Sequence, residues 1–251
     1  MIFCAMMFLG LLLGFAGAGG AGLTITLLTV GFGLSIHTAA GVALAAMSFT
    51  VLSGAISHFR EGDVLPRLGL TTGLGGIAGV FCGAYVSNNL SEATLFKLTA
   101  VMLFVSSALL YFTLFRKDLL DSFVAKHKSK AEGINFYAHA LAIGLGTGFL
   151  SGAIGIGGTA FIQISLMLFF GISLYNAIGT TMLVILPISI SGGLGYLFNG
   201  HLDLSVFAQT LFGLAIGSYF GAKLTRLAPH YVLSYIVLSM PTVGGILLLF
   251  N

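Results

Sequence analysis

Gly-Phe-Leu-Ser-Gly-Ala-Ile-Gly-Ile-Gly-Gly, at residues 148 to 158, matches the glycines of Gly-Leu-Leu-Leu-Gly-Phe-Ala-Gly-Ala-Gly-Gly, at residues 10 to 20. The offset is 138 residues (148 minus 10). It continues along the chain and pairs Gly33 with Gly171, Gly62 with Gly200, Gly75 with Gly213 and Gly79 with Gly217. The sequence therefore predicts an internal duplication. Because glycine disfavours regular helix and permits close backbone approach, glycines present in both halves predict irregular backbone or tight helix contacts.

The composition is typical of a polytopic membrane protein. Hydrophobic residues make up 57% of the 251 residues, charged residues make up 7%, and the mean hydropathy is +1.08. So few charged groups cannot cover a soluble domain. Eight charged side chains lie between Arg116 and Glu132, which predicts one solvated connector. The N-terminus has no basic region before its apolar run, so we expect a first membrane segment there rather than a cleavable signal.

Three apolar runs of spanning length follow each glycine cluster. A helix crosses the hydrocarbon core with about 20 residues. We expect such helices at about 37–59, 66–88 and 93–115, and at about 175–198, 204–226 and 231–250. The preceding stretches, about 2–33 and 135–171, would each form a helix about 48 Å long, which exceeds a core of about 30 Å. Each stretch is therefore expected to tilt strongly, to break or to fold back.

Two kinds of glycine pattern predict two different structures. Gly10-xxx-Gly14 and Gly75-xxx-Gly79-xxx-Gly83 have the small-xxx-small spacing of closely packed membrane helices. The denser clusters predict unwound backbone, which membranes tolerate only beside protein or water. They consist of Gly17, Gly19 and Gly20 in the first half and Gly155, Gly157 and Gly158 in the second.

The basic residues predict how the two halves are oriented. Arg60 and Arg67 flank one connector of the first half, whereas Lys223 and Arg226 precede the connector one position later in the second half. This opposite bias predicts inverted repeats, with the charged connector on the cytoplasmic side. The fold expected is all-α, with a first repeat over 1–115, a connector over 116–134 and a second repeat over 135–251. If each first stretch crosses once, the repeats would instead be parallel.

The polar residues predict a midplane site for an anion. Helix ends at residues 20–24 and 158–162 would point free backbone N–H groups at a ligand. No carboxylate lies inside a span, which argues against a cation as substrate. The candidate side chains are Thr24, Ser53, Thr159, Gln163, Thr180 and Ser191, with His58 and Arg60 at the mouth. The alternative interpretation is that the hydroxyls bond their own helices and that His58 and Arg60 lie at the interface.

The two glycine stretches, Ala-Ile-Gly-Thr-Thr at 177–181, Ala-Ala-Gly-Val-Ala at 39–43, and the segment from Ser53 to Gly62 resemble the TauE/SafE sulfite exporter family. The resemblance implies movement of sulfite, of sulfonates such as sulfoacetate, or of related anions across the bacterial inner membrane. Alternating access about the two glycine breaks is the expected mechanism. Ala21 and Thr159 replace the usual third glycine, and the proline expected after the glycines is missing from both halves.

Two other functions stay open. Cys4 and Cys82 would serve a membrane thiol-redox protein, and a metal-ion permease would need histidines or carboxylates within the spans. The expected partners are a small anion and the lipid bilayer, with no nucleic acid. A coupling ion, either proton or sodium, and a homodimer are left open. We expect no catalytic residue, metal site or cofactor.

Overall fold

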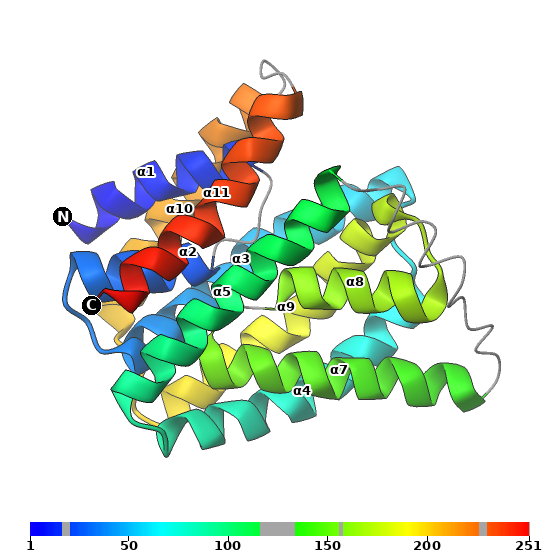
Figure 1. Ribbon diagram of the computed structural model, residues 1–251, viewed down its shortest axis with the longest axis horizontal. Helices are drawn as coiled ribbons and strands as arrows, with labels where there is room; N and C mark the ends of the chain where they lie inside the picture. The colour runs from blue at the N-terminus through cyan, green and yellow to red at the C-terminus, as the bar shows by residue number, and fades with distance from the viewer. Residues whose placement is uncertain (17–20, 116–133, 156–157, 226–229, 251) are drawn as a thin grey trace.

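The computed structural model describes residues 1–16, 21–115, 134–155, 158–225 and 230–250, and within these ranges it is helical and without strands (Figure 1). The helices of the first half are α1 (Ile2–Ala16), α2 (Ala21–Thr26), the π-helix η1 (Leu27–Gly31), α3 (Ile36–Glu61), α4 (Pro66–Asn88) and α5 (Glu92–Phe115). Those of the second half are α7 (Ile134–Ile154), α8 (Thr159–Phe170), α9 (Leu174–Phe198), α10 (Leu204–Thr225) and α11 (His230–Leu249).

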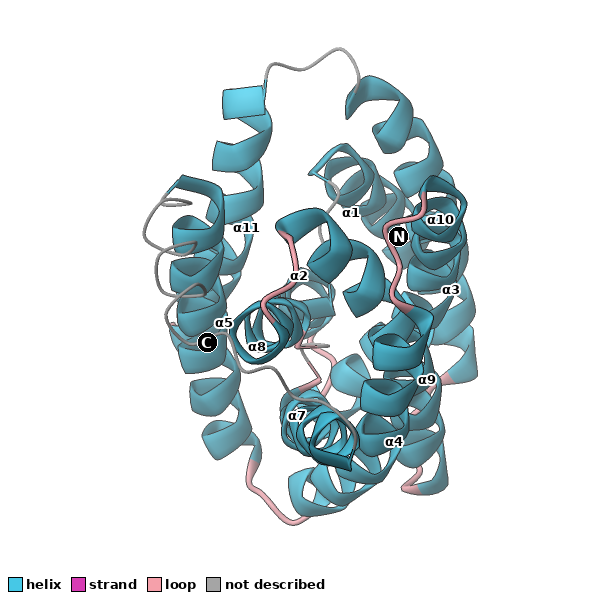
Figure 2. Ribbon diagram, turned by 90° about the vertical axis from the view of Figure 1, so that its right-hand side faces the viewer, coloured by secondary structure: helices cyan, strands magenta, loops and turns pink. Residues whose placement is uncertain are grey.

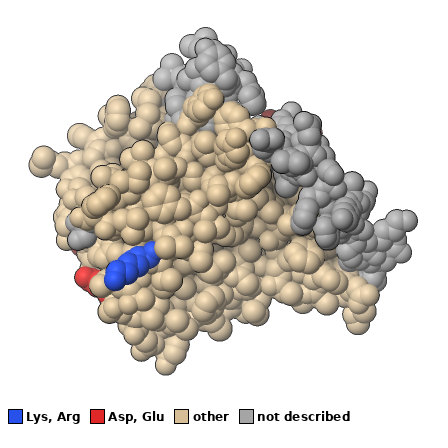
Figure 3. Space-filling view, viewed as in Figure 1, with Lys and Arg blue, Asp and Glu red and all other residues tan. Residues whose placement is uncertain are grey.

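Five of the helices in the described ranges are long and apolar enough to cross a bilayer, namely α3, α4, α5, α7 and α9. Shorter apolar helices include α8 and parts of α1 and α10. Helices α10 and α11 lie at the two remaining predicted spans. The face seen in Figure 3 is almost uncharged outside the residues drawn in grey. The chain is a multi-pass membrane protein.

Equivalent helices begin one constant distance apart. Helices α2 and α8, α3 and α9, α4 and α10, and α5 and α11 start at residues 21 and 159, 36 and 174, 66 and 204, and 92 and 230, each 138 residues apart. Ser35 and Ser173 cap α3 and α9, and each accepts a hydrogen bond of 3.2 Å from the N–H three residues on. The offset therefore extends from the glycines to helix starts and caps.

The long stretch that begins the second half folds back at its glycines. Gly155 and Gly158 have φ angles of 77° and 62°, a left-handed conformation that glycine adopts readily. Phe136 at the start of α7 contacts Phe170 at the end of α8, with ring centroids 5.2 Å apart, so the two helices are antiparallel. The predicted interruption is confirmed here. The corresponding prediction for the first half falls on Gly17, Gly19 and Gly20, which lie outside the described residues, as does Gly157.

The spaced glycines hold two parallel helix pairs together, α4 with α7 and α1 with α10. A Cβ added to Gly79 would overlap the Leu145 carbonyl oxygen and lie 2.8 Å from Phe149 N, both on α7. At the offset position, a Cβ on Gly217 would overlap the carbonyl oxygen of Met7 on α1. The close-packing interpretation of these glycines is therefore confirmed. In each pair, the first helix of one half packs against a helix of the other half: α1 against α10, and α7 against α4.

The helices at the centre run in opposite directions. Gly41 of α3 lies against Tyr196 of α9, whereas Gly54 lies against Met182, so residue numbers rise in α3 as they fall in α9. Helices α5 and α11 are also antiparallel, with a 2.7 Å hydrogen bond between the hydroxyls of Ser107 and Thr242. Figure 2 shows α2, α7 and α8 between α5 and α11 on one side and the remaining long helices on the other.

Candidate functional site

The bend between α7 and α8 is surrounded by helices of the first half. A Cβ added to Gly155 would lie 2.9 Å from Ile25 Cδ1 of α2 and would also overlap Ala40 of α3. Ala40 is only four residues from the start of α3, and α7 alone is long enough to span the membrane. The bend therefore lies near the end of the bundle at which α3 begins.

Two hydroxyl groups at this bend have no partner among the residues that the structure describes. Ser151, in the last turn of α7, is 1% exposed, and its Oγ makes no hydrogen bond within the described chain. A Cβ added to Gly158 would lie 2.8 Å from Ser151 Oγ, so this hydroxyl faces Gly158, the residue directly before α8. The Oγ1 of Thr159, which begins α8, is also buried and unpartnered among these residues. Buried hydroxyls usually find a partner, so these two unpartnered hydroxyls make the bend a candidate ligand site.

Gln163 extends this polar group along α8. It lies four residues after Thr159, and therefore on the same helix face, and it is 9% exposed. No hydrogen bond joins its amide to another residue of the described ranges. Ser151 is the member of this group that the sequence analysis missed. Its only signal is that it is a polar residue inside the glycine stretch, with Leu13 at the offset position.

The equivalent positions of the first half are apolar. Leu13, Ala21 and Ile25 correspond to Ser151, Thr159 and Gln163, and Ile25 is fully buried. Thr24 is buried but has an interaction partner. The polar group at the bend is therefore contributed by one half of the chain.

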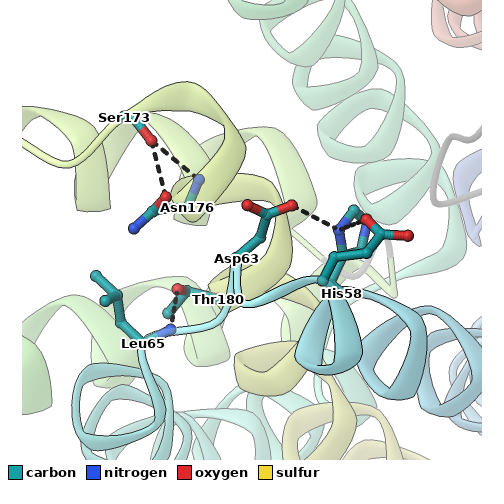
Figure 4. Close-up of polar contacts among 7 residues, drawn as sticks. His58, Asp63, Leu65, Ser173, Asn176 and Thr180 are labelled. Atoms are coloured by element: carbon teal, nitrogen blue, oxygen red, sulfur yellow. Dashed lines mark hydrogen bonds and ion pairs between the residues drawn. The ribbon is translucent and has the colours of Figure 1, made fainter.

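The other predicted residues divide between two places. Ser191 is buried on α9. The next residue, Gly192, packs on Leu44, which lies in the first half of α3, on the side of the α7–α8 bend. Thr180 lies toward the other end of α9, fully buried, and its Oγ1 accepts a 3.0 Å hydrogen bond from Leu65 N. Thr180 thus supports the corner between α3 and α4 (Figure 4). Ser53 lies within α3, between these two ends.

His58 and Arg60 lie at the α3–α4 corner, away from the bend. His58 Nδ1 is 3.7 Å from Glu61 Oε2 and 3.8 Å from Asp63 Oδ2. Arg60 is exposed, as the interfacial interpretation predicts, and makes no ion pair with a described residue. The structure therefore groups His58, Arg60 and Thr180 at one end, and Gly155, Gly158, Thr159 and Gln163 at the bend.

Tyr196 of α9 forms hydrogen bonds to α7 and α4 next to the α7–α8 bend. It is 1% exposed, and its hydroxyl donates a 2.8 Å hydrogen bond to the carbonyl of Gly152 in the last turn of α7. The Tyr196 hydroxyl oxygen also lies 3.1 Å from Ser87 Oγ of α4. Tyr196 therefore fixes the end of α7, directly before the bend, against α9 and α4. Sequence reasoning missed this role, because an isolated tyrosine in an apolar span carries no signal of its partners.

Comparison with known proteins agrees with this architecture. The family model for "Sulfite exporter TauE/SafE" matches residues 2–248. The chain is 42% identical over 252 residues to "Probable membrane transporter protein YdhB" of Bacillus subtilis, which covers the whole of both chains. It is 26% identical over 197 residues to "Probable membrane transporter protein YunE" of the same organism, covering 75% of this chain and 70% of that one. No solved structure matches. The chain belongs to the TauE/SafE sulfite exporter family and is a membrane transporter.

Proposed function

We propose that this transporter is a secondary carrier for a small sulfur-containing anion, and that the anion binds at the α7–α8 bend. The observation that carries the proposal is the pair of orphan hydroxyls, Ser151 Oγ and Thr159 Oγ1, at the first turn of α8. The first N–H groups of a helix lack partners within it and carry a partial positive charge. Hydroxyl and N–H donors together would bind an oxyanion without a buried cation.

The distribution of acidic residues supports an anion rather than a cation. Glu61, Asp63, Glu92 and Asp203 lie at helix ends or connectors, outside the interiors of the described helices. A carrier of cations would be expected to place a carboxylate inside a span. The amide of Gln163 offers one further donor on the α8 face that carries Thr159.

Sulfite, sulfoacetate or another sulfonate is the proposed substrate. The family description supports this class, and it suits a site of several neutral donors, since a sulfur oxyanion presents several acceptor oxygens. The one-sided polarity of the bend also leaves an apolar wall, formed by Ile25 and Ala40, for the remainder of an organic sulfonate.

Inverted repeats and alternating access complete the proposal. The repeats would be residues 1–115 and 135–251, joined by the cytoplasmic connector 116–134 in a bacterial inner membrane. Supporting this are the constant helix offset and the antiparallel directions of α3 and α9. Figure 1 places both chain ends on one side, as two inverted halves require. Arg60 in the last turn of α3, Arg67 in the first turn of α4 and the end of α5 would then lie on the cytoplasmic side.

Flux measurements in proteoliposomes would test the function. We expect uptake of labelled sulfite or sulfoacetate by the parent protein, and a loss of about tenfold or more in Ser151→Ala and in Gln163→Leu. Ser218→Ala is the matched control, because the Ser218 hydroxyl already donates to the Ala215 carbonyl of its own helix. Equal flux in Ser151→Ala and the control would refute the site, and absence of flux in the parent would refute the substrate class.

The thiol-redox alternative has a separate test. Cys4 and Cys82 are free, exposed, and on the separate helices α1 and α4. A Cys4→Ser/Cys82→Ser variant should transport like the parent if the chain is an anion carrier. Loss of all function in that variant would favour thiol chemistry.

A further inference from the structure

One histidine and two of the chain's seven acidic residues meet at the corner between α3 and α4. His58 Nδ1, Glu61 Oε2 and an oxygen of Asp63 all lie within 4.8 Å of one another. His58 Nδ1 is shielded from solvent and makes no hydrogen bond in the described chain, although two carboxylates face it at 3.7 and 3.8 Å. These separations are too long for hydrogen bonds. Figure 4 shows His58 beside Asp63 at this corner.

The backbone of the corner is held in one shape. Gly62 ends α3 in the left-handed conformation, with φ of 82°, and Asp63 N donates a 3.1 Å hydrogen bond back to the His58 carbonyl. The next residues are fixed to α9, because Leu65 N donates to Thr180 and a Cβ on Gly179 would lie 2.9 Å from the Asp63 carbonyl oxygen. The three side chains are therefore brought together by the fold.

We propose that His58, Glu61 and Asp63 form a binding site for a first-row divalent cation such as Zn²⁺. Zn²⁺ binds imidazole nitrogen and carboxylate oxygen at about 2.0–2.2 Å, which places two ligands of one tetrahedral ion roughly 3.4 Å apart. The two separations from His58 Nδ1 need to shorten by only a few tenths of an ångström to reach that value, and all three ligand atoms lie within 4.8 Å of one another. One imidazole with two carboxylates suits zinc and its neighbours in the first transition row.

This site goes beyond the proposed anion transport and does not depend on it. The sequence predicts no metal site, because no span interior carries a carboxylate, whereas this group lies where α3 ends. Glu61 is exposed, so the open coordination positions would take water. An ion here would join the end of α3 to the loop that is fastened to α9, and it would therefore stabilise the folded chain as any ligand of the native state does.

Calorimetric titration of the full-length, tag-free protein with Zn²⁺ would test the site, after treatment with a chelator. A Cys4→Ser/Cys82→Ser background removes the exposed thiols, which are competing ligands. We expect one saturable site in this background. His58→Ala and Asp63→Asn should each weaken Zn²⁺ binding by about tenfold or more, because each removes one of three ligands.

His139→Ala is the matched control, since His139 Nδ1 is already hydrogen-bonded to the Asn135 carbonyl on α7. It should bind Zn²⁺ like the background protein. Asp63→Asn keeps the size of the side chain, and a melting temperature equal to the background without metal shows that its fold is intact. Undiminished Zn²⁺ binding by His58→Ala, or no saturable binding by the background protein, would overturn the proposal and leave an ordinary ion pair at this corner.

Discussion

The two halves of the molecule share their backbone packing but differ in polar side chains at the first helix break. The spaced glycines of α4 contact α7 as those of α10 contact α1, at positions 138 residues apart. At the α7–α8 bend, by contrast, Ser151, Thr159 and Gln163 stand where the first half has Leu13, Ala21 and Ile25. Packing by glycine constrains the backbone of both halves, whereas a ligand site needs its donors only once.

The two corners that close the ends of α3 and α9 show the same contrast. Gly41 packs on Tyr196 and the His201 carbonyl, and Gly179 packs on His58 and the Asp63 carbonyl. These are offset partners, since 41, 58 and 63 plus 138 give 179, 196 and 201. The tyrosine forms hydrogen bonds between helices, whereas the histidine faces two carboxylates. Both corners carry titratable groups, since His201 stacks on His37 beside Tyr196, but only at the His58 corner does the offset partner of the tyrosine face two carboxylates.

Disrupting the shared packing should have the largest effect. Gly79→Leu places a side chain against the Leu145 carbonyl and Phe149 N, so we expect destabilisation above about 3 kcal/mol or failure to fold. Gly146→Ala is the control, because nothing lies within 4 Å of a Cβ there. Thermal unfolding in detergent compares the two variants. Similar melting temperatures would contradict the packing role of the α4 glycines.

Removing the hydroxyl that joins three helices should have an intermediate effect. Tyr196→Phe leaves the Gly152 carbonyl without its donor in a buried place, and we expect a loss of about 1–3 kcal/mol of stability. Tyr85→Phe is a suitable exposed comparison on α4 and should change stability little. If Tyr196→Phe melts with the parent, the tyrosine does not fasten the end of α7.

The smallest effect should be equal in both halves. Gly62 and Gly200 are offset partners with φ of 82° and 74°, and a Cβ at either would meet nothing within 4 Å. Gly62→Ala and Gly200→Ala should therefore each cost only the strain of a left-handed residue, about 1–2 kcal/mol. Chemical denaturation of the two variants measures this. Costs that differ by more than that range would show that the two turns are not equivalent.

The repetition, the break at the second glycine cluster and the packing role of the spaced glycines could be predicted from sequence. Each follows from the backbone freedom of glycine, which acts locally and leaves a periodic trace. Tyr196 could not be predicted, because its role depends on which distant residues face it, and Ser151 could not, because the burial of its hydroxyl depends on how the chain bends after α7. The hydrogen bond that the Thr180 hydroxyl accepts from the Leu65 N–H could not be predicted either. Partners across helices leave no pattern in a single sequence.

Equilibrium anion binding tests the central claim most directly, since it separates the site at the bend from the transport cycle. Purified Ser151→Ala/Thr159→Val should be titrated with sulfite and with sulfoacetate beside the parent and Ser218→Ala. The account predicts saturable binding by the parent and the control, and a loss of at least about tenfold in the double variant, as expected for two donors to a charged group. Binding of equal strength in the double variant and the parent would contradict an anion site at the α7–α8 bend.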